Sequence, residues 1–552
     1  MKIWEPDNFD GTYTNPVVYT DYSDPDVIRV GRDYFCVASS FCNSPGLPVL
    51  HSTDLLHWKM ISYGVEKLPY ERYELPQHGC GVWAPAIRYH EGEFVIFFPM
   101  PDEGIFMVKT KDPWGKWSEP VAVFEGKGWI DPCPFFDEDG RVYMVNAFAK
   151  SRIGFKSVLQ LVELKPDLTG TLGEAKVVFD GNLNDQVTIE GPKMYKRNGY
   201  YYIFAPAGGV KQGWQTVLRS KNIEGPYEYK VVCEQKDTPI NGPHQGGYVD
   251  TESGEYWFLH FQDVYAAGRI MNLEPMHWVE DWPVIGEAAE GEMCGKPVIT
   301  WKKPDVSHNQ DVLKDIKTKV VEQQQQESDV EDDFDKDTVG LMWQWNANYK
   351  EEWYTCCPKQ SVIRLHAIQK ESTISNQPNL FLQKWPAPEF TIRFQCDVSE
   401  LTDGDMSGII NMGVDYAALA VKKEKGLFSL IKIIGRQKFE KEIATAVDTY
   451  ETVVDNLEKS DFMQGKMQNK IYFQYKVNAL PSIKCNTEGK YAFWIKREQV
   501  VFSYSTDGKN FTPIMELEPS AGRWVGTKFG VFCCSDHKES KGSLLLESVK
   551  LV

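Results

Sequence analysis

From its N-terminus to about residue 305, the chain repeats one pattern of apolar and polar positions five times. Each copy has a start rich in Pro or Gly, a few apolar residues, a polar turn with Gly or Asp, and an aromatic-rich segment. In TIEGPKMYKRNGYYYIF (188–204) the turn is Asn-Gly, which tolerates the positive φ of a two-residue hairpin turn. The pattern therefore predicts five β-hairpins. The other four are DPDVIRVGRDYFCVASS from residue 24, WAPAIRYHEGEFVIFF from 83, DPCPFFDEDGRVYMVNAF from 131 and PHQGGYVDTESGEYWFLHF from 243.

The spacing of the five turns indicates a propeller. Their glycines recur roughly every 50–60 residues, the kind of fixed period that marks propellers and arrays. This spacing leaves room for about two further strands per copy, so each copy would form a four-stranded blade. We interpret 51–64 and 219–230 as outer strands, and we expect 271–286 to close the last blade on the first. The turn glycines are Gly31, Gly92, Gly140, Gly199 and Gly254.

The rest of the chain divides into a connector and a second β unit. Charged residues and four consecutive Gln replace the aromatics between residues 306 and 335, so we predict a charged linker there, with room for one short helix. Alternating apolar residues return at 336–552 with frequent Gly-containing turns, which favours a β-sandwich. Because helical periodicity is nearly absent, we predict an all-β protein: a five-bladed β-propeller over 1–305, then the linker and the sandwich.

Composition narrows the possible partners. The net charge of −18 argues against nucleic acid and anionic membranes, and it fits a neutral ligand. No apolar run has the length of a signal sequence core or a membrane span, so we expect a cytoplasmic protein, with a processed secreted chain as the alternative. The twelve Cys show no zinc-type spacing, and we expect them to be reduced and mostly buried.

The starts of the five copies carry the candidate chemistry. In a propeller the innermost strands surround one channel, so equivalent positions meet near its axis. Clustered carboxylates repel one another and raise one another's pKa, so folding alone does not favour bringing them together. One such residue would be only a turn former at the start of a strand, but three acids at equivalent positions favour a functional site. The residues at these positions are Asp24, Trp83, Asp131, Glu190 and His244.

Five motifs that follow one another along the chain resemble the motifs of glycoside hydrolase family 43. They are SDPDVIRVGRDYF, GVWAPAIRYHEGEF, IDPCPFFDEDG, TIEGPKMYKRNGYYYIF and GRIMNLEPMHWVEDWPVIG. The second half resembles the concanavalin-like jelly-roll sandwich that accompanies the xylosidase and arabinofuranosidase branches, in WQWN (343–346) and AGRWVGTKFG (521–530). The resemblance covers nearly the whole chain and implies an inverting glycosidase on a five-bladed propeller.

The resemblance implies a role for each acid. Asp24 would be the general base, Glu190 the general acid, and Asp131 would orient the acid and tune its pKa. This agrees with the chemistry, because cleavage of a glycosidic bond with inversion needs one protonated and one ionised carboxyl, about 6.5–9.5 Å apart. Acids from different blades can meet that separation across a channel.

The resemblance also implies substrate-binding residues. Phe41 and Trp83 would be walls of the sugar pocket, and Trp524 would reach over it from the sandwich. For these three the alternative is ordinary core packing. Arg269 would bind a sugar hydroxyl and offset the negative charge, and its alternative is a surface salt bridge.

His244 corresponds to the channel histidine that holds an ion, often calcium, in the resembling family. The alternative is a core histidine held by a hydrogen bond. One imidazole suits calcium poorly as its sole protein ligand, so we expect any calcium here to be structural, and we expect no other cofactor.

These observations lead to two classes of function. The first is an exo-acting glycosidase that removes terminal α-L-arabinofuranosyl or β-D-xylosyl residues from small xylan-type oligosaccharides. An alternative within this class is an endo-arabinanase, which would need an open cleft. The second is a carbohydrate-binding protein without catalysis. Residues 146–157 differ from the Trp-bearing segment of many xylosidases, so arabinose and xylose both stay open, as do the linkage, the natural substrate and the oligomeric state.

Overall fold

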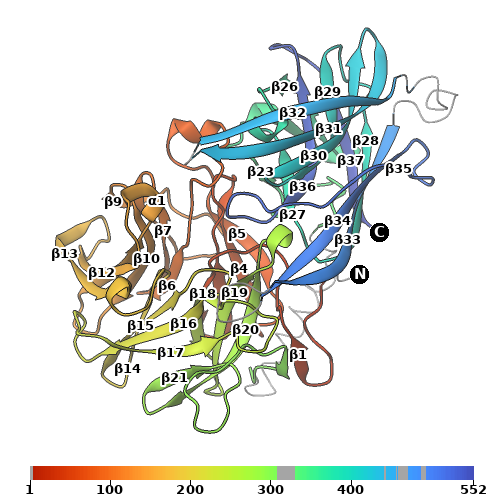
Figure 1. Cartoon of the computed structure of the whole chain (residues 1–552). Helices are drawn as coiled ribbons and strands as arrows, with labels where there is room; N and C mark the ends of the chain where they lie inside the picture. The colour runs from red at the N-terminus through yellow and green to blue at the C-terminus, as the bar shows by residue number, and fades with distance from the viewer. Residues whose placement is uncertain (1–3, 307–329, 441–442, 456, 458–469, 486–492) are drawn as a thin grey trace.

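The computed structural model describes residues 4–306, 330–440, 443–455, 457, 470–485 and 493–552. The described residues form two β units, coloured red to green and cyan to blue in Figure 1. The short helix expected in the linker falls outside the described residues. The helical turns are α1 (Lys150–Ile153), η1 (Glu71–Glu74), η2 (Gly181–Leu183), η3 (Tyr265–Ala267), η4 (Glu351–Trp353), η5 (Pro358–Gln360) and η6 (Ile374–Asn376).

The first unit confirms the predicted five-bladed propeller. Each blade is an antiparallel sheet of four strands in sequence order. The five turn glycines all join the first two strands of a blade, and all have positive φ, between 64° and 88°. The blades are β2 (Asp26–Val30), β3 (Asp33–Val37), β4 (Gly46–Ser52), β5 (Lys59–Val65); β6 (Ala86–His90), β7 (Glu93–Met100), β8 (Gly104–Thr110), β9 (Val121–Glu125); β10 (Trp129–Phe136), β11 (Val142–Phe148), β12 (Val158–Leu164), β13 (Thr171–Asp180); β14 (Lys193–Arg197), β15 (Tyr200–Ala207), β16 (Trp214–Ser220), β17 (Glu228–Glu234); β18 (His244–Asp250), β19 (Tyr256–Asp263), β20 (Arg269–Val279), β21 (Trp282–Ile285).

Apolar clusters between neighbouring blades hold the ring together. One of them joins the first and fifth blades through buried residues such as Val27 and Leu259. The predicted closing segment, 271–286, forms most of β20 and all of β21 in the fifth blade. The N-terminal segment completes the closure: the Val17 N–H donates to the carbonyl of Met271 at 2.9 Å, and β1 (Thr12–Thr14) pairs with β22 (Thr300–Lys302).

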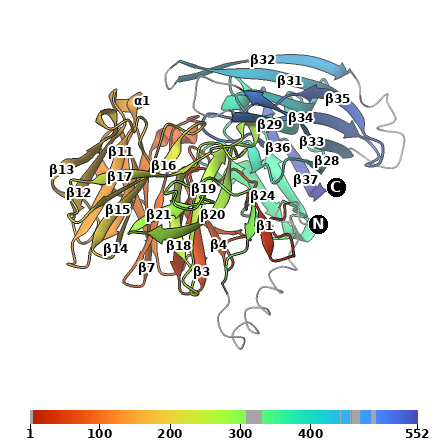
Figure 2. The same ribbon diagram turned by 60° about the horizontal axis from the view of Figure 1, so that its bottom comes forward.

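The second unit confirms the predicted sandwich (Figure 2). Its two sheets enclose a core that includes Val330 and Phe334, so the last residues of the predicted linker pack on this unit. One sheet contains β23 (Gln344–Trp345), β27 (Phe381–Lys384), β36 (Lys528–Ser535), β29 (Asp405–Met412), β30 (Asp415–Glu424), β31 (Leu427–Glu440) and β32 (Ile443–Val454), with β26 (Ile368–Gln369) beside β36; the other contains β24 (Tyr354–Cys357), β25 (Val362–His366), β37 (Ser543–Leu551), β28 (Phe390–Asp397), β33 (Lys470–Cys485), β34 (Phe493–Ser505) and β35 (Thr512–Leu517).

The segment WQWN connects the sandwich to the propeller. Trp345 and Ser44 exchange backbone hydrogen bonds of 2.6 and 3.1 Å in an isolated bridge. Three residues after Trp345, the Asn348 side chain accepts the N–H of Leu68 and donates to its carbonyl, both at 2.8 Å. An amide side chain of the sandwich that pairs with propeller backbone in this way fixes how the two units fit together, because the loss of either bond would leave a buried polar group unpaired.

The buried carboxylate of Asp21 lies where the two units meet. It is 3% exposed, and its two oxygens accept the backbone N–H groups of Arg269 at 2.8 Å and of Gly526 at 2.9 Å. The ammonium group of Lys384, on strand β27, donates to the Asp21 carbonyl at 2.6 Å. Asp21 therefore binds the fifth blade and a sandwich loop at the same time.

All twelve Cys are free thiols, and eight of them are buried, as expected from the sequence. Within the described part of the chain, no helix has the length and apolar character that a membrane crossing would need.

We predict that Asp21→Asn destabilises the whole chain. An amide nitrogen cannot accept a hydrogen bond, so one of the two buried N–H groups loses its acceptor, which costs about 1–3 kcal/mol. Thermal unfolding followed by calorimetry should show a lower Tm. Asp185→Asn, at an exposed position, is the control and should leave Tm unchanged. Equal Tm values for both variants would mean that the Asp21 carboxylate does not join the two units.

Candidate active site

One pocket of about 250 Å³ brings together all the residues that the sequence singled out. It lies at the mouth of the channel, and the loop before β36 contributes one side chain from the sandwich. The predicted convergence of the blade starts is therefore observed, together with the predicted wall residues and the arginine. These lining residues are Asp24, Phe41, Trp83, Asp131, Glu190, His244, Arg269 and Trp524.

Irregular backbone at the starts of the inner strands aims the acids. Asp24 precedes β2 and Asp131 lies in β10, and both have left-handed φ, at 57° and 55°. The pairing of β10 with β11 shifts register between Ile130 and Cys133, so Asp131 sits in a bulge. Bulges redirect a side chain that would otherwise follow the alternation of the strand. Such strained conformations are rare in ordinary strands and concentrate at functional sites.

Asp24 is surrounded by hydrogen-bond donors. The hydroxyls of Ser23 and Ser39 each donate to its Oδ2 at 2.6 Å, and Nη1 of Arg269 lies 3.0 Å from Oδ1. A buried carboxylate needs such partners to remain charged. Arg269 is itself only 8% exposed, so the alternative of a surface salt bridge is wrong, and the arginine offsets the charge of Asp24 directly.

Asp131 and Glu190 form the second acidic group. Asp131 is 2% exposed and its Oδ2 accepts the N–H of Gly191 at 2.7 Å. Burial and the neighbouring charge of Glu190 raise the pKa of Asp131 to about 8. The Glu190 side chain is 23% exposed, so it faces the pocket more than Asp131 does. Gly191 has φ 59°, and a Cβ there would come within 2.7 Å of the Gln245 side chain, which explains the glycine.

His244 binds the acid rather than a group of metal ligands. Its Nε2 lies 2.9 Å from Oε1 of Glu190, and its side chain is buried. No group of three or more His, Cys, Asp or Glu suited to a metal ion occurs among the described residues. The buried Nδ1 of His244 has no hydrogen-bond partner in the part of the chain that the structure describes. Because calcium takes six to eight oxygen ligands, one imidazole nitrogen beside a carboxylate does not by itself fit this ion. A structural calcium at His244 stays a prediction from the resemblance.

The predicted wall residues, Phe41, Trp83 and Trp524, contribute aromatic rings to the apolar part of the pocket. Phe41 and Trp83 are neighbours, with ring centroids 6.1 Å apart, and the guanidinium of Arg152 lies 4.9 Å from the Trp83 ring. Trp524 is 43% exposed, so the alternative that it is a core residue of the sandwich is wrong. Its loop is fixed to the propeller because Gly526 donates to Asp21 and the Thr527 N–H donates to the Ala266 carbonyl at 2.8 Å.

The sequence did not reveal the residues that support this pocket. Asp21 and Ser39 act through bonds to partners distant in the chain, which no local pattern announces. Residues around α1 also line the pocket. They belong to the segment 146–157, whose sequence differs from the Trp-bearing segment of many xylosidases. These are Phe148, Ala149, Lys150, Ser151 and Lys156.

Known proteins share both units. Residues 13–283 match glycosyl hydrolases family 43, and residues 331–545 match the β-xylosidase C-terminal concanavalin A-like domain. A Xylanibacter ruminicola protein assigned as a β-xylosidase is 39% identical over 379 residues, which are 68% of this chain and 67% of that protein. A β-xylosidase of Formosa agariphila is 26% identical over 575 residues, covering 97% of this chain and 89% of that one.

A solved structure has the same fold over almost all of this chain. A bifunctional GH43-CE protein from Bacteroides eggerthii superposes with a TM-score of 0.76 at 27% identity, covering 98% of this chain and 63% of that one. The relatives and the fold thus extend to the sandwich as well as the propeller. With three acids in one pocket at the mouth of a five-bladed propeller, the chain belongs to glycosyl hydrolases family 43.

Proposed function

We propose that this glycoside hydrolase removes terminal β-D-xylosyl or α-L-arabinofuranosyl residues from xylan-type oligosaccharides, with inversion at the anomeric carbon. The observation that carries the proposal is the arrangement of Asp24, Asp131 and Glu190 in one pocket with different partners. A binding protein without catalysis would have no use for such a cluster, because neighbouring buried acids destabilise the fold.

The environments of the acids support distinct roles. Asp24 accepts bonds from two hydroxyls and an arginine, which suits a charged base that activates water. Asp131 and Glu190 interact, so the proton represented by the raised pKa of Asp131 belongs to the pair. Because Asp131 is buried against Gly191 and Glu190 faces the pocket, Glu190 is the member that can pass a proton to the leaving oxygen.

The shape of the pocket favours a chain end over the middle of a polymer. Trp524 and its anchored loop lie over one side of the channel mouth, where an endo-acting enzyme would need an open cleft. The relatives support only a class of sugar, terminal pentosyl residues. The Formosa agariphila relative is a β-xylosidase, and a Bacteroides ovatus relative, 28% identical over 422 residues, is a non-reducing end α-L-arabinofuranosidase. We therefore propose terminal pentosyl residues without choosing between the two sugars.

We predict that Asp24→Asn and Glu190→Gln each lower kcat on aryl pentosides by about 10²–10⁴-fold, because each removes one partner of the acid–base pair. The leaving group separates the roles. A dinitrophenyl pentoside needs little protonation, so it should restore most of the activity of Glu190→Gln and none of that of Asp24→Asn. Glu224→Gln, at an exposed position, is the matched control. Wild-type kcat in either variant would refute the role assigned to that residue.

We also predict inversion at the anomeric carbon. Proton NMR of a reaction in progress should show the inverted anomer first.

We predict that Asp131→Asn stabilises the protein progressively as the pH rises from about 4 to 8. The pKa of Asp131 is raised from 3.8 to about 8 on folding, so the folded state prefers the protonated acid. The wild type therefore loses stability between these two values, whereas the neutral amide does not. The difference in Tm between variant and wild type should be small near pH 4 and largest above pH 8. A difference independent of pH would show that the pair of Asp131 and Glu190 does not hold a proton in this pH range.

We predict that Trp524→Ala lowers kcat/KM by about ten- to thirtyfold, because an aromatic wall contributes about 1–2 kcal/mol through stacking and exclusion of water. Its half-exposed side chain should leave Tm nearly unchanged. Trp114→Ala removes a Trp of similar exposure, 48%, that lies outside the pocket, and it should leave kcat/KM unchanged. A large fall in Tm with normal kcat/KM would place Trp524 in the sandwich core instead.

A further inference from the structure

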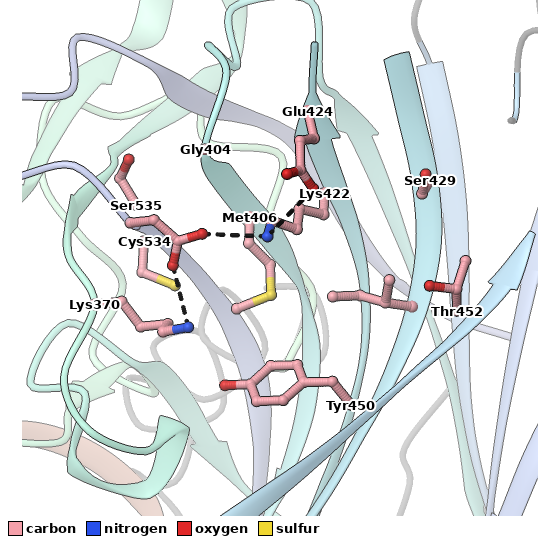
Figure 3. Close-up of a pocket in the computed structure, with 12 residues that line it drawn as sticks. Lys370, Gly404, Met406, Lys422, Glu424, Ser429, Tyr450, Thr452, Cys534 and Ser535 are labelled. Atoms are coloured by element: carbon pink, nitrogen blue, oxygen red, sulfur yellow. Dashed lines mark ion pairs between the residues drawn. The ribbon is translucent and has the colours of Figure 1, made fainter. Parts of the chain in front are cut away.

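A second pocket, of about 300 Å³, lies on the sandwich and shares no residue with the catalytic pocket. It crosses five adjacent strands of one sheet: β36, β29, β30, β31 and β32 (Figure 3). Register explains why its residues meet. Cys534 pairs with Met406, Met406 with Lys422, and Lys422 with Ser429, so these four side chains form one row across the sheet. Direct cross-strand neighbours lie on the same face.

The floor of this pocket is apolar. Met406, Ile431 and Cys534 belong to a buried cluster on this face of the sheet. Tyr450, on β32, lines the pocket (Figure 3). The residue is 43% exposed. Its hydroxyl donates to Asp448 at 2.9 Å, and the Lys370 ammonium lies 5.1 Å from the ring centroid. The ring is thus fixed in place before any ligand arrives, which lowers the entropic cost of binding.

The rim of the pocket is charged but neutral in sum. Lys422 lies 3.2 Å from Asp536 and 3.6 Å from Glu424, and Lys370 lies 3.1 Å from Asp536. Two cations and two anions compensate one another, so the rim gives no net attraction to a charged ligand. Ammonium and carboxylate groups held in such a network still have hydrogen-bonding capacity left, the former to donate and the latter to accept.

From these features we propose that the sandwich binds a neutral oligosaccharide in this pocket. A sugar ring has an apolar face of C–H groups and a rim of hydroxyls that both donate and accept. The Tyr450 ring and the apolar floor complement the C–H face of the sugar, and the paired charges complement its hydroxyls. The volume is at the lower end of the range for small-molecule sites and suits one or two sugar rings. The ligand is therefore a segment of a chain such as a xylo-oligosaccharide, bound away from the catalytic acids.

This binding site is independent of catalysis. In an enzyme that acts on chain ends, such a pocket would retain an oligosaccharide on the enzyme and raise its local concentration near the catalytic pocket. The inference concerns binding alone, so it stands or fails without the assignment of the catalytic residues.

Calorimetric titration of the full-length Asp24→Asn protein with xylotetraose tests the proposal, because this background prevents hydrolysis. We expect two classes of site. Adding Tyr450→Ala should weaken one class by about tenfold or more and leave the other unchanged. Tyr450→Phe should keep most of the affinity, since the ring is retained. Tyr89→Ala, which removes a propeller Tyr of similar exposure, 45%, is the control and should change neither class.

Each of the following results would overturn the proposal: a single class of site in the parent protein, unchanged binding in Tyr450→Ala, or equal loss in Tyr450→Ala and Tyr89→Ala. Tyr450→Leu covers the case in which the Ala variant has a lower Tm, since it keeps an apolar side chain but no ring, and it should bind as weakly as Ala. Binding should also be nearly insensitive to salt between low and high ionic strength. An affinity that falls steeply with salt would mean an ionic ligand and contradict the neutral one.

Discussion

The arrangement of the catalytic pocket depends on one buried carboxylate that does not line it. Asp21 holds the backbone of Arg269 with one oxygen and that of Gly526 with the other. Arg269 in turn binds Asp24, and Gly526 fixes the loop that carries Trp524. A carboxylate can accept several N–H bonds at once, and such charge-assisted bonds are stronger than neutral ones. The position of the proposed base and the position of the pocket wall therefore have a common origin.

The pocket also contains conformations and charges that folding alone would avoid. Asp24 and Asp131 have left-handed backbone angles, and Asp131 shares its surroundings with Glu190. The apolar clusters between blades hold the starts of the inner strands in place, so the strain is tolerated there. Stability distributed around the ring thus allows a locally unfavourable cluster at its centre.

The sequence was informative where the chain repeats. Because the five hairpins have the same pattern, the positions equivalent to Asp24 in the other blades could be named, and they meet in one pocket. Two alternatives could not be settled without side-chain positions. Burial showed that Arg269 forms no surface salt bridge, and exposure showed that Trp524 is not a core residue. Asp21, Ser39 and the pocket around Tyr450 had no repeated pattern to reveal them, since each depends on long-range pairing.

The bond between Asp21 and Gly526 joins residues 505 positions apart. On the ribosome, the five blades emerge long before the loop that contains Gly526 is translated. Contacts of such high sequence separation form late in folding, after the entropic cost of closing the intervening chain has been met. The propeller therefore has its acids in place while one wall of the pocket is still missing, and a nascent chain acquires a complete catalytic pocket only after the loop that contains Gly526 has been synthesised.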